Sequence, residues 1–345
     1  MSQDLLASII LLHWHTRQYL EDCLASLHDQ EITQDQYEII FVDNGAGDDG
    51  ADWVAQHYPA VVMLRFENNL GFCRANNEAV ARARGRYLLF LNVDTVVHRH
   101  WLATLIEAMQ TYPTLGACQS NMVMPWTSEF AQWPQRTMPQ HLYYYDLSPY
   151  GFTRYLRRTM TATPQRTLFV SGASTIMDSQ LLPRLGCLFD ERFFAYGEDI
   201  DLSLRINALG YDTAVVPTSA VYHRASLPTK IKPSRAALTR VVRLIANRFL
   251  AYYKNLYPSE FLQFLPWLLG GAPLKLTEVG WQGQRQLLYL LPALALSLAG
   301  VTLAVAQHAP YRRARAQSLA VRQRPPGWFY HHLVRNIRPP LEAHA

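Results

Sequence analysis

Residues 85–97 read GRYLLFLNVDTVV, an apolar run that passes into a polar turn. The run Tyr87–Leu91 is typical of a strand that is buried on both faces of a sheet. Asn92 and Asp94 follow directly where such a strand would end. The segment therefore predicts a buried strand with polar groups at its carboxyl end.

The sequence before this segment alternates between strand and helix patterns. Three more apolar runs cover Leu5–Leu12, Tyr37–Val42 and Val61–Phe66, and helical patterns cover Asp52–Tyr58 and Gly71–Ala83. Strands that alternate with helices over short connections predict an α/β fold with a doubly wound, mostly parallel sheet.

Two aspartates follow predicted strands. Asp43 comes directly after Tyr37–Val42, and Asp94 comes shortly after Tyr87–Leu91. Ligands of such sheets bind at the carboxyl ends of the strands, so both carboxylates are expected at the binding edge. An exposed turn is the alternative for either residue alone, because aspartate is favoured in turns.

A second acidic cluster lies in residues 188–209, LFDERFFAYGEDIDLSLRINAL. Glu198, Asp199 and Asp201 open a helical pattern that ends before Gly210. Carboxylates in a first helical turn stabilise the helix dipole, which is one explanation of the cluster. The three aromatic residues just before it favour another, because a partly desolvated carboxylate has a raised pKa that suits proton abstraction.

Composition and charge exclude several classes of protein. A hydrophobic fraction of 49% over 345 residues excludes intrinsic disorder. The four cysteines form no CxxC pair, which argues against a disulfide scaffold or structural zinc and favours a reducing compartment. Residues 1–230 carry 17 basic and 24 acidic side chains, whereas residues 231–345 carry 15 and 3. The basic last third suggests an anionic partner, either nucleic acid or a membrane surface.

Apolar residues accompany this charge and favour a membrane. Gln286–Gln307 contains no charged residue, and as a helix it would span roughly 33 Å against a hydrocarbon core of about 30 Å. Pro292 and Gly300 interrupt the run, and basic residues flank both ends, so an interfacial position and a single span both remain open.

Ser234–Tyr257 is a basic amphipathic pattern. Its polar face holds Arg240, Arg243, Asn247 and Lys254, and its apolar face holds Leu238, Ile245, Phe249, Tyr252 and Leu256. Such a helix is typical of a bilayer interface, although a core-packing helix with solvated arginines gives the same pattern. We expect one domain over residues 1–230 that folds without the membrane-associated helical region at 231–345.

An ordered set of motifs between Ser8 and His223 resembles a known family. The strings are SIILLHWHTRQYLEDCLASL, FVDNGAGDDG, ENNLGFCRANNEAV, GRYLLFLNVDTVV, VSGASTIMDSQLL and FDERFFAYGEDIDLSLRINALGYDTAVVPTSAVYH. Together they resemble the inverting GT-A glycosyltransferases of family 2, and most closely the rhamnosyltransferase-like branch of bacterial cell-envelope polysaccharide synthesis. The resemblance implies a GT-A, Rossmann-like catalytic domain that transfers a sugar, rhamnose among the candidates, from a nucleotide diphosphate.

The resemblance also assigns a metal site and a base. The family's metal motif falls on Asn92-Val93-Asp94, so Asp94 would bind Mg²⁺ or Mn²⁺ with His223 as a second ligand. The family's base motif falls on Glu198-Asp199, with Asp199 as the catalytic base. A carboxylate that holds a hard divalent ion beside phosphate oxygens agrees with the ligands that these ions prefer.

The implied nucleotide-binding residues are Asp43, Asn92, Arg74 and His13. Asp43 would accept the N3–H of uracil or thymine, which cytosine lacks, so a UDP- or dTDP-sugar is expected. Relatives commonly have Asn-Tyr-Asn where this chain has His13-Trp14-His15, which makes the nucleotide contacts of that strand uncertain.

Three other functions agree less well with the sequence. A processive polysaccharide synthase would carry a Gln-x-x-Arg-Trp motif, and the nearest string, residues 282–286, lacks the tryptophan. A sugar-1-phosphate nucleotidyltransferase would need a glycine-rich loop after the first strand, where this chain reads HWHTRQ. A non-catalytic, membrane-bound nucleotide-sugar-binding protein would be expected to lose Asp94 or Asp199, and both are present.

The expected partners are a nucleotide-sugar, a lipid-linked or glycan acceptor and an anionic membrane surface at the cytoplasmic face of a bacterial inner membrane, with no nucleic acid. The aromatic-rich segment 121–167, with Arg154, Arg157 and Arg158, suits either an acceptor site or a packed insertion. Donor sugar, acceptor and oligomeric state stay open at this point.

Overall fold

The computed structural model describes residues 5–224, 235–280, 286–334 and 341, and it gives residues 235–237, 272–280 and 286–293 as helix without side chains. The predicted boundary after Lys230 and most of the string 282–286 therefore lie outside the described residues.

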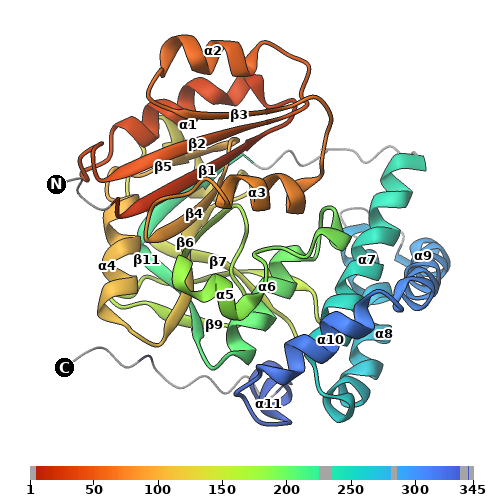
Figure 1. Ribbon diagram of the computed structural model, residues 1–345. Coiled ribbons are helices and arrows are strands. Elements are labelled where there is room, and N and C mark those ends of the chain that lie inside the picture. The colour runs from red at the N-terminus through yellow and green to blue at the C-terminus, as the bar shows by residue number, and fades with distance from the viewer. Residues whose placement is uncertain (1–4, 225–234, 281–285, 335–340, 342–345) are drawn as a thin grey trace.

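A single large sheet forms the centre of the molecule (Figure 1). Its path runs β3-β2-β1-β4-β10-β6-β11-β5, and β9 also pairs with β11. The strands are β1 (Ala7–His13), β2 (Tyr37–Asn44), β3 (Val62–Phe66), β4 (Tyr87–Asn92), β5 (Thr95–Val97), β6 (Leu115–Val123), β9 (Gln165–Thr167), β10 (Ser174–Asp178) and β11 (Asp212–His223).

The predicted α/β fold with parallel strands is confirmed for the first half of this sheet. Strands β3, β2, β1 and β4 are mutually parallel, and β6 is parallel to β11. Strand β10 runs antiparallel between β4 and β6, and the short strand β5 is antiparallel to β11. The carboxyl ends of β1, β2 and β4 therefore share one edge with the end of β11.

Helices cover both faces of the sheet, as the buried strands require. One face packs against α1 (Leu20–His28), α2 (Gly50–His57) and α4 (Trp101–Thr111). The other packs against α3 (Phe72–Val80), the short α5 (Leu182–Leu185) and α6 (Glu198–Ala208). Side chains alternate between the two cores along each strand: Ile9 and Leu11 of β1 face one, and Ile10 faces the other.

The aromatic-rich segment folds mainly as a packed insertion. Strands β7 (His141–Leu147) and β8 (Thr153–Thr159) form an antiparallel hairpin outside the main sheet. The rings of Tyr143 and Tyr155 stack within it, with centroids 5.9 Å apart. The buried Tyr143 hydroxyl donates a 2.9 Å hydrogen bond to Glu129. Packing accounts for most of these aromatic residues.

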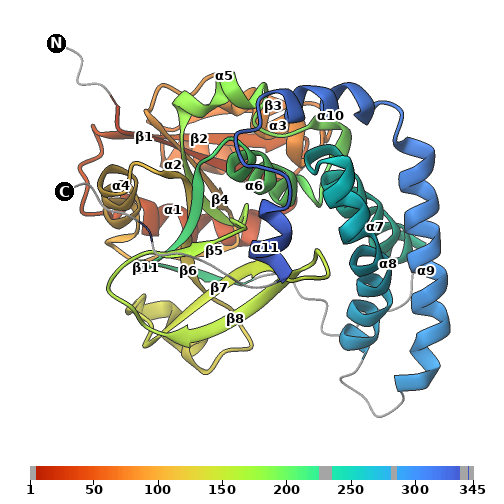
Figure 2. The same ribbon diagram turned by 90° about the horizontal axis from the view of Figure 1, so that it is seen from below.

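The chain ends in helices that lie against the part formed by residues 5–224. Figure 2 shows α7 (Arg235–Asn255), α8 (Pro258–Gly280) and α9 (Gln286–Gln307) side by side, followed by α10 (Tyr311–Ala320), which crosses back, and α11 (Trp328–Val334). A Cβ on Gly300 of α9 would lie 2.6 Å from the Cβ of Ile245 on α7. The glycine therefore permits the close approach of α9 to α7.

The amphipathic helix α7 is buried more deeply than its sequence pattern predicts. Its apolar residues Ile245 and Tyr252 are fully buried, as is Leu256 just after the helix. Asn247 and Lys254, which the pattern places on a solvated face, are buried as well, because they bind Tyr196 and Asp190. The prediction that this apolar face lies in a bilayer is wrong for these residues, because protein covers it.

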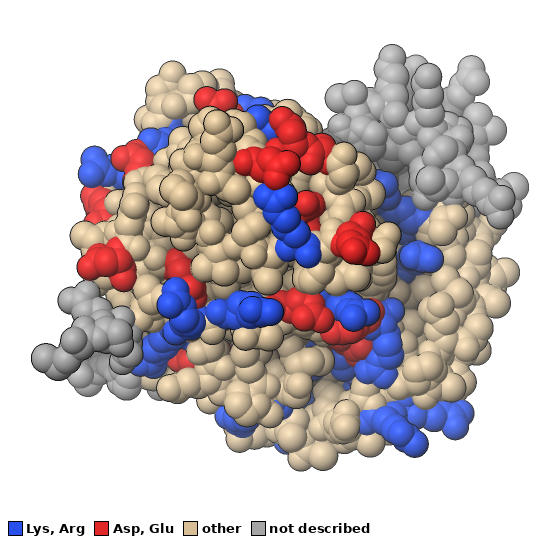
Figure 3. All heavy atoms as spheres, turned by 45° about the horizontal axis from the view of Figure 1, so that its top comes forward, with Lys and Arg blue, Asp and Glu red and all other residues tan. Residues whose placement is uncertain are grey.

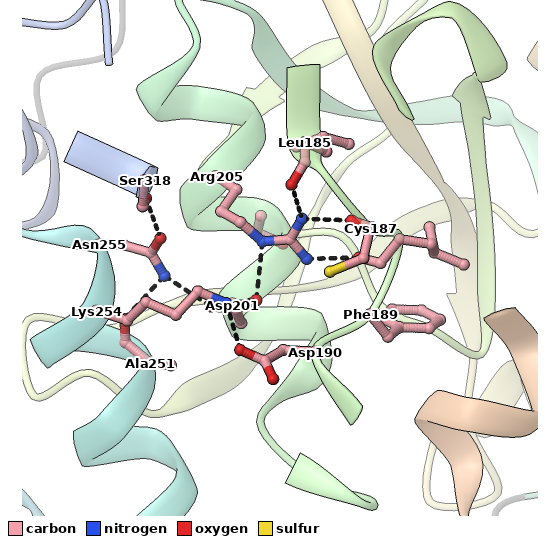
Figure 4. A network of polar contacts seen from close by, with 12 residues as sticks. Leu185, Cys187, Phe189, Asp190, Asp201, Arg205, Ala251, Lys254, Asn255 and Ser318 are labelled. Carbon is pink, nitrogen blue, oxygen red and sulfur yellow. Dashed lines mark hydrogen bonds and ion pairs between the residues drawn. The ribbon is translucent and has the colours of Figure 1, made fainter. Parts of the chain in front are cut away.

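A buried polar network joins α7 to α6 and to Asp190 (Figure 4). The Nζ atom of Lys254 lies 2.8 Å from Oδ2 of Asp190 and 2.9 Å from Oδ2 of Asp201 on α6. Asp201 also accepts hydrogen bonds from Arg205 and from Asn255, at 2.9 and 2.8 Å.

Two basic side chains lower the pKa of one carboxylate in this network. Burial alone would raise the pKa of Asp190, but hydrogen bonds and charge from Arg192 and Lys254 hold it well below its usual range. Removal of either basic side chain would leave part of this charge buried without compensation.

The described residues include no helix with the length and hydropathy to cross a membrane. Figure 3 shows basic and acidic side chains interspersed on the face that it draws, rather than segregated by sign. Membrane association of the C-terminal region stays a prediction.

Candidate active site

The predicted metal ligands meet where β11 pairs with β5. His223 ends β11 and faces Thr95 in the antiparallel register, which brings it beside Asp94. Nε2 of His223 lies 3.1 Å from Oδ1 of Asp94, and the amide nitrogen of Asn92 lies 3.5 Å from the same ring nitrogen. The structure thus brings His223 beside Asn92 and Asp94, which precede it by more than a hundred positions in the sequence.

Asp94 and His223 fit a divalent ion. Both side chains are largely but not completely buried, and Nδ1 of His223 is buried without a hydrogen-bond partner. A carboxylate oxygen and an imidazole nitrogen are ligands that Mn²⁺ and Mg²⁺ accept. Across the described parts of the chain no group of three acidic, histidine or cysteine side chains could hold a metal. An ion at Asp94 and His223 would therefore need ligands from phosphate or water as well.

The predicted base lies at the first turn of α6. Glu198 is buried, its Oε2 atom has no hydrogen-bond partner, and burial together with the charges of Asp199 and Asp201 raises its pKa. Burial also raises the pKa of Asp199 above that of an ordinary aspartate, although hydrogen bonds from backbone N–H groups oppose the effect. A carboxylate with a raised pKa is a better proton acceptor for a hydroxyl.

An aromatic loop, residues 193–197, leads into this turn with an unusual backbone. Phe194, Tyr196 and Gly197 have positive φ angles of 59°, 69° and 89°. Positive φ is costly for residues other than glycine and persists only where the surroundings enforce it.

Asn247 of α7 holds the aromatic loop in place. Its Nδ2 atom lies within hydrogen-bond distance of three loop carbonyls, those of Phe193, Ala195 and Tyr196, at 3.0, 3.1 and 2.7 Å. The backbone N–H of Cys73 on α3 donates to the Phe194 carbonyl at 3.1 Å. The loop is therefore anchored from both sides. The sequence pattern places Asn247 on a solvated face and therefore does not predict that Asn247 anchors the aromatic loop.

Gly71, before α3, makes room for the aromatic loop. It has a φ of 83°, and a Cβ at this position would lie 2.5 Å from the ring of Phe194. Any larger residue would displace that ring.

His13 does not present a free ring nitrogen to a nucleotide. It is fully buried, with Nδ1 2.7 Å from the Thr16 hydroxyl and Nε2 2.8 Å from the Asp48 carboxylate. Its ring also stacks on Phe41, with centroids 5.4 Å apart. A nucleotide-binding role for His13 stays a prediction; in the structure its ring links the two loops that carry Thr16 and Asp48.

Asn92 lies beside His223, whereas the predicted nucleotide residues Asp43 and Arg74 have other partners. Asp43 is half-buried at the end of β2 and accepts a 3.0 Å hydrogen bond from the Ala46 backbone. Arg74 is exposed in the first turn of α3, 3.8 Å from Glu78. Neither residue contacts Asp94 or Asp199 directly.

Two asparagines that sequence reasoning did not select also shape this edge. Asn44 accepts a 2.9 Å hydrogen bond from the Leu70 backbone, and its amide group donates to Asn69 at 3.1 Å. The linkage ties the end of β2 to the turn before α3. Their positions in the sequence are the signal that could have identified them: Asn44 lies in the motif string at 41–50, beside Asp43, and Asn69 lies in the string at 67–80, close to Gly71.

A cavity of about 780 Å³ opens between this edge, the aromatic loop and α7. The lining includes Trp14, Asn69, Phe194, Tyr196, Arg240 and Arg243. We call it the α7 cavity. Its described lining combines apolar rings with two guanidinium groups and includes no carboxylate.

Solved structures share this architecture. The fold resembles that of GalNAc-T7 with UDP, GalNAc and Mn²⁺, with a TM-score of 0.58 at 14% identity over 90% of this chain and 59% of that one. It also resembles *Staphylococcus aureus* TarS 1-349 in complex with UDP-GlcNAc, with a TM-score of 0.53 at 16% identity over 92% and 89%. At these identities the likeness establishes a GT-A-like fold.

Two bacterial relatives are similar in sequence. O-antigen biosynthesis protein RfbC of *Myxococcus xanthus* is 28% identical over 222 residues, which are 59% of this chain but 16% of that protein. N-acetylglucosaminyl-diphospho-decaprenol L-rhamnosyltransferase of *Mycobacterium tuberculosis* (strain CDC 1551 / Oshkosh) is 25% identical over 236 residues, 63% of this chain and 75% of that protein.

A family model covers the strands and turns that carry most of these side chains. The model for glycosyl transferase family 2 matches residues 8–185, more than half of the chain. The match includes Asp43, Asn92 and Asp94 and ends before Asp199 and His223. On this match, with the GT-A-like fold, the chain belongs to glycosyl transferase family 2 and is a glycosyltransferase.

Proposed function

We propose that this protein is an inverting, divalent-metal-dependent glycosyltransferase. It moves a single sugar from a UDP- or dTDP-sugar to a lipid-linked glycan acceptor in the synthesis of a cell-envelope polysaccharide. The observation that supports the proposal best is the pairing of Asp94 with His223 at the binding edge of the sheet. The two relatives, named for O-antigen biosynthesis and for a diphospho-decaprenol substrate, support the acceptor class.

Asp94 and His223 would hold Mg²⁺ or Mn²⁺. The bound ion would neutralise charge that develops on the leaving diphosphate. The largely buried position of both side chains limits competition from bulk water at this point. Asn92, beside the His223 ring, would help to fix the orientation of that ring.

Asp199 would accept the proton of the acceptor hydroxyl. In a single displacement, the hydroxyl oxygen bonds to the anomeric carbon while the bond from that carbon to the diphosphate oxygen breaks, which inverts the centre. The proton passes to the Asp199 carboxylate, and the electron pair leaves with the nucleoside diphosphate. The raised pKa of Asp199 supports this role.

Asp43 would select the base of the donor. A carboxylate accepts a hydrogen bond from N3–H of uracil or thymine, and cytosine has no donor at that position. Rhamnose, the sugar in the name of the mycobacterial relative, is the first candidate for the transferred group.

The outer surface of the C-terminal helices would hold the enzyme at the cytoplasmic face of a membrane. Leu262 and Leu269 of α8 and Leu294, Leu298 and Val305 of α9 are exposed. Arg312 and Arg313, also exposed, lie in the first turn of α10. Apolar side chains beside basic ones are typical of interfacial helices.

The test is a panel of UDP- and dTDP-sugars with a prenyl-diphosphate-linked sugar acceptor, with Mn²⁺ or Mg²⁺ or with EDTA. We expect metal-dependent release of nucleoside diphosphate with at least one donor, and none from the Asp199→Asn variant. Donor binding without release across the panel would favour a non-catalytic binding protein. Addition of many sugars to one acceptor would favour a processive synthase.

A further inference from the structure

We propose that Arg224 is a positioning residue for the metal site. Its side chain holds the end of β11 against neighbouring segments and so fixes the imidazole of His223 beside Asp94. The inference rests on the proposed function, in which His223 and Asp94 hold a divalent ion. It also gives the aromatic-rich segment 121–167 a role, because part of that segment supports the end of β11.

The backbone links Arg224 to the other proposed metal ligand. His223 is the last residue of β11, and its pairing with Thr95 ends the ladder between β11 and β5. The next residue adds one contact, because the N–H of Arg224 donates a 2.9 Å hydrogen bond to the carbonyl of Asp94. The separation of the two ligands therefore depends on where the end of β11 lies.

The guanidinium of Arg224 is held from three sides. Its Nη2 atom lies 2.9 Å from Oδ2 of Asp22 on α1. Its Cζ atom lies 4.4 Å from the ring centre of Trp133 and 5.5 Å from that of Tyr19, just before α1. An exposed ion pair alone stabilises little, but a planar guanidinium over an aromatic ring adds a cation–π contact. These contacts fix the residue that follows His223.

The residue that precedes His223 is held by the same part of the chain. Residues 128–137, which we call the η2 segment, include the 3₁₀ helix η2 (Ser128–Gln135). The buried Tyr222 donates a 2.6 Å hydrogen bond from its hydroxyl to the Thr137 carbonyl, and its ring packs against Trp133, with centroids 6.5 Å apart. Trp133 therefore contacts the residues on both sides of His223.

His223 depends on these neighbours because its own ring has no second anchor. A metal-binding histidine usually donates from its other ring nitrogen to a carboxylate or a carbonyl, which fixes the ring. The contacts of the His223 ring with Asp94 and Asn92 are both made by Nε2. Among the described residues, its buried Nδ1 has no hydrogen-bond partner. The anchored side chains of Tyr222 and Arg224 therefore take the place of that hydrogen bond.

The experiment measures how Mn²⁺ promotes the binding of UDP, by isothermal titration at a series of Mn²⁺ concentrations. We expect Arg224→Gln to raise the Mn²⁺ concentration that gives half of the effect by about tenfold or more, as is typical when a residue that orients a metal ligand is lost. UDP binding without metal should stay as in the wild type, because the variant leaves the predicted nucleotide residues in place.

Arg86→Gln is the matched control. Arg86 also pairs with an aspartate, Asp178 at 3.3 Å, and its guanidinium lies over the ring of Tyr87. It precedes β4, whereas Asp94 follows β4, so the two lie at opposite ends of that strand. The control should change neither the Mn²⁺ dependence nor the metal-free binding.

Trp133→Leu tests the same contact without a change in β11. It should shift the Mn²⁺ dependence in the same direction by about threefold, whereas Trp126→Leu, which alters an exposed tryptophan of the same segment, should not. The double variant of Arg224→Gln with Trp133→Leu should lose less than the sum of the two single losses, because both changes remove one shared contact. Additive losses would overturn the role of the Arg224–Trp133 contact.

Other results separate this inference from the proposed function. If Mn²⁺ promotes UDP binding and Arg224→Gln leaves that dependence unchanged, the positioning role fails while the proposed function stands. An equal loss with and without metal would show a general structural role and would also overturn the inference. A metal dependence that Arg224→Gln weakens, in a protein that transfers sugar from no donor, supports the positioning role and contradicts the proposed activity. If no divalent ion changes UDP binding, both fail.

Discussion

The environment of Asp199 supports its proposed role as the catalytic base. We expect Asp199→Asn to lower kcat by about 10²–10⁴, because a general base contributes a factor of that size. Donor affinity should stay near the wild-type value. Steady-state kinetics and UDP titration check both results, and near-normal turnover at saturating donor would show that Asp199 is not the base.

The pH profile tests the same carboxylate. Burial raises the pKa of Asp199, so the base form is lost as pH falls through a value above that of an ordinary aspartate. The acid limb of kcat/KM should therefore lie above the pH range near 4 in which exposed aspartates titrate.

Asp94 is predicted to act through the metal. Asp94→Ala should weaken UDP binding in the presence of Mn²⁺ and leave the weaker metal-free binding unchanged, because only the ion-mediated contact is lost. Isothermal titration with and without Mn²⁺ separates the two. Full activity in excess EDTA would contradict a metal-binding role for both Asp94 and His223.

At the scale of elements, Asn247 connects α7 to the aromatic loop. Asn247→Asp replaces an amide donor by a carboxylate that faces three carbonyls, so the loop should shift and kcat should fall at least tenfold. UDP affinity should be unchanged, since the loop does not carry the predicted donor residues. A loss of UDP affinity equal to the loss of kcat would indicate general misfolding, which thermal unfolding would also detect.

Helix α9 is predicted to contact the membrane through its outer side chains. Leu294→Glu with Leu298→Glu should reduce binding to vesicles that contain anionic lipid at least tenfold, since both side chains are exposed and apolar. High salt should release little of the wild-type protein. The matched control is Ala304→Ser on the buried side of α9, and equal vesicle binding by the double variant would exclude this surface.

The elements could be predicted from sequence where periodicity is strong. The strand Val61–Phe66 and the helix Gln286–Gln307 match β3 and α9 almost residue for residue. The pairing of Asp94 with His223 depends on a strand register that periodicity does not encode. The burial of Asn247 and Lys254 was missed for a similar reason, since an amphipathic pattern shows two faces but not which partner covers the polar one.

At the scale of the whole molecule, the C-terminal helices share a hydrophobic core with the first part of the chain. Ala246, Leu250 and Tyr252 of α7 belong to the same buried cluster as Leu204 of α6. Lys254 forms ion pairs with Asp190 and Asp201 inside it. A sequence-based boundary after Lys230 predicts a self-sufficient first domain, and these contacts argue that residues 1–230 depend on α7.

Deletion of residues 231–345 should therefore give an aggregated protein rather than a soluble nucleotide-binding domain. The deletion exposes the apolar surface under α7 and leaves two buried aspartates without Lys254, and loss of one partner of a buried ion pair costs about 3–5 kcal/mol. Lys254→Met in the full chain isolates that electrostatic part and should lower Tm measurably, with UDP affinity retained in the folded fraction. Arg82→Gln serves as the surface control. A soluble 1–230 fragment that binds UDP normally would show that the nucleotide site forms without α7. The effect of Asn247 on catalysis would then come from the aromatic loop alone.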